Sequence, residues 1–302
     1  MPITLHTHSG QFCCHATGKL EDVVLAAIEK GFICIGLSEH IFRTRTQDLY
    51  PEEIEMNVDC KKLKETWIEF VKEARRLQKK YSNKINILVG TETENIHKET
   101  IQEIKDIVKE YPLDYMVGSV HHVYETPTDF DKEMFNDALA KSPEKTPDSL
   151  YQSYFDLQYD IITQLQPKII GHFDVIRMYT PEAKLSDKTW EKIKRNVDAI
   201  NAYGGIFEIN SRAWKKGLEF AYPFKDILQY IISKDSKITL GDDSHDPAQV
   251  GLHYDKLYNY LKEMNIKKVY YLEYNPENSE IIEKTIDNIQ DKSFWKFLEK
   301  SN

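Results

Sequence analysis

The sequence has few cysteines, no long apolar run and no excess of positive charge. Its four cysteines are Cys13, Cys14, Cys34 and Cys60, which show no CxxC spacing. With no secretory signal apparent, this pattern predicts a protein of the reducing cytoplasm. No apolar stretch approaches the roughly 18 residues that a membrane-spanning helix needs, so we expect no membrane partner. The formal net charge of −9 argues against a general nucleic-acid binder, which needs a basic face to neutralise phosphates.

No internal repeat, low-complexity tract or linker divides the 302 residues. Hydrophobic residues make up 41% and aromatic residues 12% of the chain, which is enough for a substantial core and unlike a disordered protein. α/β barrels commonly use this length for one domain. We therefore expect a single domain over residues 1–302, with the oligomeric state left open.

Short strand-like apolar runs alternate with amphipathic helix-like runs, which is the pattern of βα units around a parallel sheet. We expect strands at 3–7, 33–38, 86–91, 115–120, 168–172, 206–210 and 237–242, and a candidate further strand at 269–274. We expect helices at 19–30, 59–80, 98–110, 150–165, 187–203, 224–234 and 255–264. Residues 125–148 interrupt this rhythm with three prolines among charged residues. They indicate a surface insertion after the fourth strand.

Seven of the ten histidines and two carboxylates stand at, or just after, the ends of expected strands. Residues i and i+2 of a strand face the same side, so His6 with His8, and Asp243 with His245, present paired ligand atoms. In such barrels, catalytic groups gather at the carboxyl ends of the strands. The candidate ligands are His6, His8, His15, His40, Glu92, His121, His172, Asp243 and His245. One His-x-His pair is a weak signal, whereas ligand-type residues at six of seven strand ends predict a metal centre.

The types of ligand narrow the choice of metal. Imidazole and carboxylate ligands suit zinc, manganese or iron without choosing among them. Nine ligands are too many for one tetrahedral ion and suit three divalent ions, with Glu92 as a bridge between two. Only two carboxylates oppose the charge of about +6, which leaves roughly +4 and favours a phosphate dianion as ligand. We expect Cys13 to stay outside the ligand set, and the three other histidines to lie behind the metal ligands or at the surface without binding metal: His97, His122 and His253.

The assembled segments resemble the PHP superfamily (polymerase and histidinol phosphatase), and within it the monofunctional histidinol-phosphate phosphatases of the fungal type. The matching segments, in family order, are LHTHS at 5–9, FCCHA at 12–16, LSEH at 37–40, VGTE at 89–92, GSVHH at 118–122, IGHFD at 170–174, EINS at 208–211 and GDDSH at 241–245. The resemblance implies a distorted (β/α)7 TIM-like barrel that holds three divalent metals. It also implies the ligand groups: His6, His8, Glu92 and Asp243 for one metal, His15, His40 and His245 for a second, and Glu92, His121 and His172 for the third.

The activity that the resemblance implies is hydrolysis of L-histidinol phosphate to L-histidinol and phosphate, in histidine biosynthesis. The family binds the substrate phosphate with basic residues near the fifth and sixth strands. Here Arg177 fits the first of these positions and Lys215 the second. Other candidates for this contact are Arg212, Lys216, Arg43 and Arg45.

Phosphate monoesters hydrolyse so slowly without a catalyst that acid–base catalysis alone, worth about 10²–10⁴-fold, is not enough. We therefore expect attack by a hydroxide that bridges two metal ions, with Asp243 orienting it or accepting its proton. The leaving group would take a proton from His245 or from a water on the metal. Two other interpretations stay open. One is a phosphatase of the same superfamily for another small phosphomonoester, such as a nucleotide or a sugar phosphate. The other is a non-catalytic module that metal only stabilises.

Overall fold

The computed structural model describes residues 2–291 and 295–296, and its centre is an all-parallel seven-stranded sheet. The strands are β1 (Ile3–Thr4), β2 (Cys34–Leu37), β3 (Asn86–Glu92), β4 (Tyr115–Gly118), β7 (Ile169–Ile170), β8 (Ile206–Asn210) and β9 (Lys237–Gly241). They follow one another in the sheet in chain order. The first and last strands meet, because a parallel bridge joins Thr7 to Ser244 and the Leu5 N–H donates to the Leu240 carbonyl over 3.4 Å. The sheet is therefore a nearly closed (β/α)7 barrel, as the sequence predicts.

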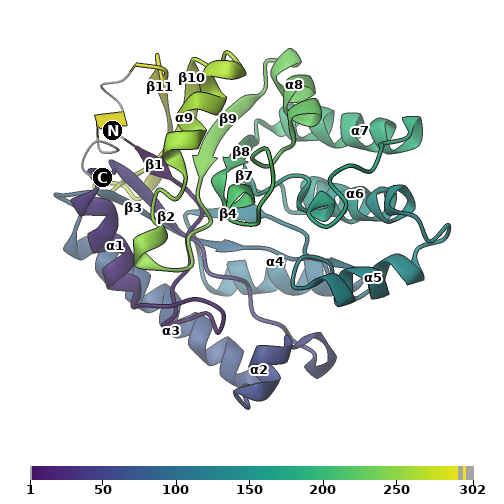
Figure 1. The fold of residues 1–302 in the computed structure, drawn as a ribbon. Coiled ribbons are helices and arrows are strands. Elements are labelled where there is room, and N and C mark those ends of the chain that lie inside the picture. Colours follow the sequence, from purple (N-terminus) through teal and green to yellow (C-terminus); the bar gives the residue numbers. More distant parts are fainter. Residues whose placement is uncertain (1, 292–294, 297–302) are drawn as a thin grey trace.

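Helices surround the outside of this barrel (Figure 1). The longer ones are α1 (Leu20–Glu29), α3 (Cys60–Lys80), α4 (Thr100–Glu110), α6 (Pro147–Gln164), α7 (Asp187–Tyr203), α8 (Lys225–Ser233) and α9 (Tyr254–Glu263). These are the predicted helices, with ends displaced by at most three residues. In α3, the residues Trp67, Phe70, Ala74 and Leu77 recur on one face and are buried against the sheet, as an amphipathic helix requires. Among the described residues, no helix is both long and apolar enough to cross a membrane.

Several short elements were not predicted. They are α2 (Pro51–Glu55), α5 (Lys132–Lys141), the hairpin of β5 (His122–Val123) with β6 (Thr126–Pro127), and the 3-10 turns η1 (Thr46–Asp48), η2 (Val175–Arg177), η3 (Ser211–Trp214) and η4 (Pro247–Gln249). Residues 125–148 contain β6, α5 and the first two residues of α6. Within α5, Phe135 and Ala138 are buried in the second hydrophobic cluster. This segment therefore adds to the core; that it is an insertion in a single domain stays a prediction.

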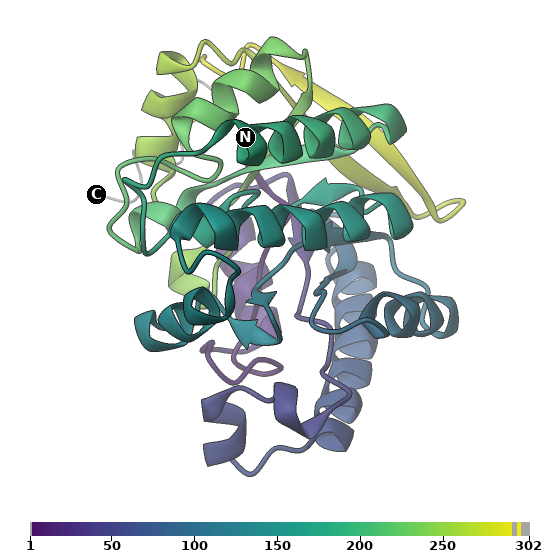
Figure 2. The same ribbon diagram turned by 90° about the vertical axis from the view of Figure 1, so that its right-hand side faces the viewer.

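A second hairpin covers the amino end of the barrel. It pairs β10 (Lys268–Asn275) with β11 (Glu280–Asp287) in antiparallel fashion and appears as the yellow ribbon at the upper right of Figure 2. The Cys34 thiol donates to the Leu272 carbonyl over 3.2 Å, and the Asn86 side-chain amide donates to the Tyr274 carbonyl over 2.9 Å. Cys34 and Asn86 begin their strands, so the hairpin lies at the amino end and leaves the carboxyl end accessible. The strand predicted at 269–274 is confirmed, and its partner β11 was missed.

Glycines allow an aromatic side chain to fill the barrel interior. The Tyr115 hydroxyl donates to the Leu5 carbonyl over 2.8 Å. A Cβ atom at Gly36 would lie 2.1 Å from that hydroxyl oxygen, and one at Gly90 would lie 2.4 Å from the Tyr115 ring. Both distances are far inside van der Waals contact, so only glycine fits at these two strand positions. Tyr115 begins β4, and its ring therefore packs below the carboxyl end, where the predicted ligands lie.

Candidate metal centre

The carboxyl ends of the strands bring the nine predicted ligands together. Within the described part of the chain, four groups of side chains have ligand atoms within 4.8 Å of one another: Cys13, His15, His40 and His245; His6, His8 and Asp243; His6, Glu92 and His172; and His8, His40 and Glu92. The remaining predicted ligand, His121, contacts two of these residues. Its Nε2 atom lies 3.3 Å from Nε2 of His172 and 3.2 Å from Oε1 of Glu92.

Glu92 lies at the centre of this cluster. Its Oε1 atom is 2.9 Å from Nε2 of His172 and 3.3 Å from Nε2 of His6. Its Oε2 atom is 2.8 Å from Nδ1 of His40 and 3.5 Å from Nε2 of His8. The two oxygens of one carboxylate thus face different imidazoles from different strands. A carboxylate that bridges two cations needs this arrangement.

The spacing of the ligand atoms fits divalent metal ions. Zinc–nitrogen bonds of about 2.0–2.1 Å at tetrahedral angles separate two ligand atoms by roughly 3.4 Å. The Nε2 atoms of His15 and His40 are 3.2 Å apart, and those of His121 and His172 are 3.3 Å apart. Three buried atoms at the centre lie close to neighbouring ring nitrogens or carboxylates but make no well-aligned hydrogen bond among the described residues: Nε2 of His6, Nε2 of His8 and Oε2 of Glu92. Such burial costs about 1–3 kcal/mol per atom unless a ligand satisfies it, and a cation would satisfy all three.

Further carboxylates contact the Nδ1 atoms of three of these imidazoles. Oε1 of Glu208 lies 3.1 Å from Nδ1 of His6, and Oε2 of Glu94 lies 2.7 Å from Nδ1 of His121. Glu39 approaches Nδ1 of His8 at 3.4 Å. A carboxylate on Nδ1 fixes the tautomer and leaves Nε2 free for a metal.

Sequence reasoning missed these three carboxylates, although a signal was present. Glu208 stands alone in the apolar strand IFEIN, and a buried charge there has to be paired. Glu39 directly precedes a predicted ligand, and Glu94 follows Glu92 by two residues. The net charge expected for the pocket with three divalent ions was roughly +4, counted with two carboxylates. The three further negative charges reduce it to about +1. The pocket is therefore much less cationic than the sequence predicts.

Burial and neighbouring charges shift the pKa values of these ligands in opposite directions. Burial opposes protonation of His6, but Glu208, Glu92 and other carboxylates outweigh it and raise its pKa well above the usual value. For His8, the effect of burial is outweighed by Asp243 and Glu39, which raise the pKa to about 9. For His40 and His245, burial dominates, and the neighbouring His8 adds to it, so both pKa values fall well below the usual value. The metal-free cluster therefore holds protons that a bound cation has to displace.

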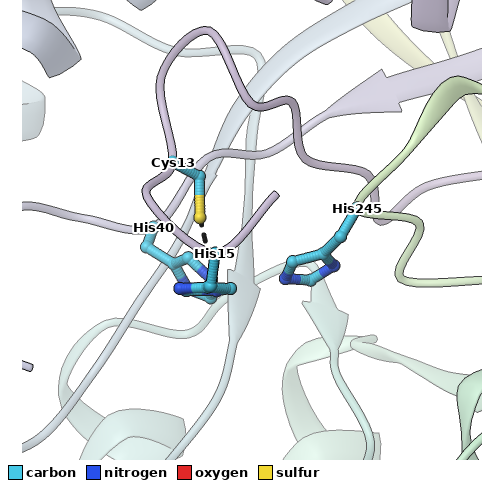
Figure 3. A group of neighbouring side chains, drawn as sticks. All are labelled: Cys13, His15, His40 and His245. Atoms are coloured by element: carbon cyan, nitrogen blue, oxygen red, sulfur yellow. Dashed lines mark hydrogen bonds between the residues drawn. The ribbon is translucent and has the colours of Figure 1, made fainter. Parts of the chain in front are cut away.

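One thiol joins the group that the sequence analysis kept free of sulfur. The Cys13 sulfur lies 3.3 Å from Nε2 of His15, and Figure 3 shows it close to His15 and His40, with His245 on the facing segment. The turn at residues 9–17, in which the Cys13 N–H donates to the Ser9 carbonyl and the Gly10 N–H to the Thr17 carbonyl, brings the thiol to the imidazoles, and that Cys13 stays outside the ligand set remains a prediction. The four cysteines of the chain are all free.

A cavity of about 280 Å³ opens onto the ligands. Its lining includes His15, His40, Glu92, His121, His172, Asp243 and His245. Two basic side chains also line it, Arg212 and Lys216. Both are among the further candidates that the sequence offers for phosphate binding. The volume lies just below the usual range for ligand cavities, about 300–1,000 Å³, and suits a small metabolite.

The three basic residues favoured by the sequence for phosphate binding lie elsewhere. The Arg177 guanidinium donates to Asp226 over 2.8 Å, and it is not among the residues that line the cavity. Lys215 is exposed and also outside the lining. Arg43 forms an ion pair with Glu53 beside a neighbouring hollow. Arg45, the other candidate after His40, pairs with Asp48 and Glu125 at the surface.

The three histidines expected to be ordinary lie outside all four ligand groups. His122 is buried, and its Nδ1 atom lies 3.2 Å from the same Glu94 oxygen that contacts His121. His97 is buried beside Glu99, at 3.1 Å. His253 precedes α9 in the left-handed conformation, with φ of 56°.

Comparison with known proteins gives consistent matches. The family model described as the PHP domain matches residues 4–212. A Schizosaccharomyces pombe protein named probable histidinol-phosphatase is 44% identical over 299 residues, with 97% of each chain covered. A Saccharomyces cerevisiae histidinol-phosphatase is 29% identical and covers 96% of this chain and 98% of its own. A solved structure of a Lactococcus lactis histidinol phosphate phosphatase, complexed with zinc, L-histidinol and phosphate, superimposes with a TM-score of 0.68. It has 20% identity and covers 93% of this chain and 98% of its own.

Proposed function

This chain belongs to the PHP domain family, and we propose that it is a metal-dependent phosphomonoesterase that hydrolyses L-histidinol phosphate to L-histidinol and phosphate. Similarity to two fungal histidinol-phosphatases over nearly the whole chain supports the substrate. The observation that carries the metal dependence is Glu92, whose two oxygens face separate sets of imidazoles at the floor of a small cavity.

The proposed cofactor is a set of three divalent ions, of zinc, manganese or iron. The groups of His6, His8 and Asp243, of His15, His40 and His245, and of Glu92, His121 and His172 support three positions. When bound, such ions make water nucleophilic near neutral pH and offset charge on phosphoryl oxygens. The protein contributes the fixed imidazoles, the shared carboxylate and a cavity of limited size.

Asp243 is the proposed residue for orienting the attacking water or accepting its proton. Its carboxylate is 3.3 Å from Nε2 of His8 and lines the cavity. Its backbone adopts φ of 47°, and its carbonyl accepts hydrogen bonds from Arg212 over 2.7 Å and from Nδ1 of His245 over 2.9 Å. The left-handed turn thus directs the carboxylate to the ligands and the carbonyl to two neighbours.

His245 is predicted from the sequence both as a ligand and as a proton donor to the leaving group. Its Nδ1 atom is hydrogen-bonded to the Asp243 carbonyl, so Nε2 alone is left, and one nitrogen cannot serve both roles at once. Burial and the nearby His8 lower the pKa of His245 well below its usual value. A neutral imidazole suits a ligand better than an acid, so we propose ligation for His245 and a water as the proton donor.

Arg212 is our proposed phosphate contact. Its Nη1 atom is engaged with Asp243 and Gln249, while its Nη2 atom makes no hydrogen bond to any described residue. The exposed Lys216 lines the same cavity. Arg177, in contrast, is held by Asp226 and lies 4.4 Å from the centre of the Phe224 ring. We therefore favour Arg212 over Arg177, Lys215 and Arg43.

A panel of phosphomonoesters tests the proposed substrate. The value of kcat/KM should be highest for L-histidinol phosphate, compared with nucleotide monophosphates and sugar phosphates. A higher value for one of those would favour the rival phosphatase. Dialysis against EDTA should abolish the activity, and zinc, manganese or iron should restore it, whereas a sample dialysed without EDTA should keep it. Full activity after metal removal would contradict the proposal. Bound metal without any phosphatase turnover would support the non-catalytic module.

A further inference from the structure

Asp129 is a carboxylate of the cavity wall that belongs to none of the ligand groups. It lies between β6 and α5 and is half-buried. Within the part of the chain that the structure describes, its side chain forms no hydrogen bond or ion pair. Its negative charge acts on groups around the cavity. It raises the pKa of Tyr50, where burial has the largest effect, and together with other carboxylates it raises the pKa of His121. A half-buried anion without a protein partner is suited to a cationic ligand.

Aromatic side chains adjoin this carboxylate. The rings of Tyr50 and Phe130 stack with centroids 5.6 Å apart at 27°, and both line the cavity. Tyr222 also lines the cavity, and its hydroxyl is buried without a hydrogen-bond partner among the described residues. Aromatic faces attract cations and stack on planar rings. Asp129 and the Tyr50–Phe130 pair therefore offer a carboxylate and flat apolar surface. Tyr222, whose segment pairs with Asn210 at the end of β8, adds a free hydroxyl from the β8 sector.

The basic side chains enter from another sector of the barrel. Arg212 belongs to η3, directly after β8, and it bonds to the Asp243 carbonyl after β9. Asp129 follows β4, and β7 separates β4 from β8 in the sheet. The cavity wall is thus polarised in charge, with Arg212 and Lys216 after β8 and Asp129 with Phe130 in the segment after β4, and Tyr222 comes from the β8 sector.

We propose that Asp129, assisted by the Tyr222 hydroxyl, binds the positively charged end of the substrate and so selects phosphomonoesters that carry a cation remote from the phosphate. This inference rests on the proposed function and names its specificity determinant. L-Histidinol phosphate has such a cationic end in its ammonium and imidazole groups. Sugar phosphates and glycerol phosphate have none. The charge of Asp129 thus favours L-histidinol phosphate, in addition to the selection by the size of the cavity.

The test compares two substrates in one variant. In Asp129→Asn, the ratio of kcat/KM for L-histidinol phosphate to kcat/KM for glycerol 3-phosphate should fall about 10- to 100-fold, which is the range for losing one charge-assisted hydrogen bond. In Tyr222→Phe, the ratio should fall by a smaller factor, about 2- to 10-fold. The control is Asp137→Asn, which removes the same charge from an exposed position of α5 and should leave the ratio unchanged.

Product inhibition gives an independent readout. The inhibition constant of L-histidinol should rise in Asp129→Asn, while that of inorganic phosphate should stay as in the wild type, which also shows that the variant is folded. If the wild type prefers L-histidinol phosphate and Asp129→Asn keeps the same substrate ratio, the role of Asp129 is overturned and the proposed function stands. If the wild type does not prefer L-histidinol phosphate, the proposed function itself fails.

Discussion

Replacing Glu92 by glutamine should remove two metal ions together. The carboxylate contacts His172 and His6 through Oε1, and His40 and His8 through Oε2. Glutamine keeps one oxygen and places an NH2 group where the other oxygen was, so one set of imidazoles loses its shared ligand. It also removes the negative charge from a fully buried position.

The size of the effect follows from the number of ions that the carboxylate serves. A charge-assisted interaction in a buried site is worth about 1.5–3 kcal/mol, which corresponds to roughly 10- to 100-fold in affinity for each ion bound by Glu92. Glu39→Gln is a matched control, because this carboxylate reaches a ligand only through Nδ1 of His8, at 3.4 Å. Removing such a supporting carboxylate typically costs about 10–100-fold for one ion only. Glu92→Gln should therefore affect two ions where Glu39→Gln affects one.

Metal content after dialysis against a metal buffer, measured by inductively coupled plasma mass spectrometry, reports the outcome. We expect three ions per chain in the wild type and one in Glu92→Gln, held by the group of His15, His40 and His245. His15→Ala should lose mainly one ion. Three ions retained by Glu92→Gln, at wild-type affinity, would refute the bridging role.

Three further predictions concern the phosphate, the pH and the packing. Arg212→Ala should raise KM and the inhibition constant of phosphate about 10- to 100-fold, whereas Arg177→Ala should change neither by more than a few-fold. The metal-free protein should be most stable near pH 6.5 in urea denaturation. The raised pKa of His8 stabilises the folded state at lower pH, and this contribution is lost as the pH rises from 6.5 to about 9. Because the pKa values of His40 and His245 are depressed, the folded state binds fewer protons than the unfolded state below pH 6.5, so the free energy of unfolding decreases as the pH is lowered. Gly241→Ala should lower metal content, because its Cβ would lie 1.7 Å from the Glu208 oxygen that contacts His6.

Much of the fold was predictable because its signals are local. The helix from Asp187 to Tyr203 has its N-cap in Ser186, whose hydroxyl accepts from the Thr189 N–H, and both ends were predicted. The strands that carry ligands are short apolar runs, and chain order equals sheet order. That the candidate ligands lie together followed from one physical fact, which is that parallel strands end on the same side. The hairpin partner β11 was missed because half of its residues, EIIEKTID, are charged and do not alternate regularly with apolar ones, so it resembles a surface segment.

The rest of the site depends on the directions in which side chains point, which the local sequence does not determine. Arg177 and Arg212 both follow strands of the barrel, yet one guanidinium is held by Asp226 and the other lines the cavity. Nothing in the local sequence separates them, because the difference arises from a partner 49 residues away. The same holds for Glu208, whose contact with His6 joins β8 to the segment after β1. Asp129 stands in a segment that resembled a surface insertion, and its neighbour Thr128, whose N–H and hydroxyl both donate to the His121 carbonyl, brings that segment to the cavity.

An anomalous-scattering map of crystals grown with native metal and soaked in phosphate would show whether the cluster holds three ions. We expect three peaks among the nine candidate ligand side chains, two of them sharing Glu92, with the phosphate on the Arg212 side of the cavity. A map without any peak within bonding distance of Glu92 would contradict this expectation.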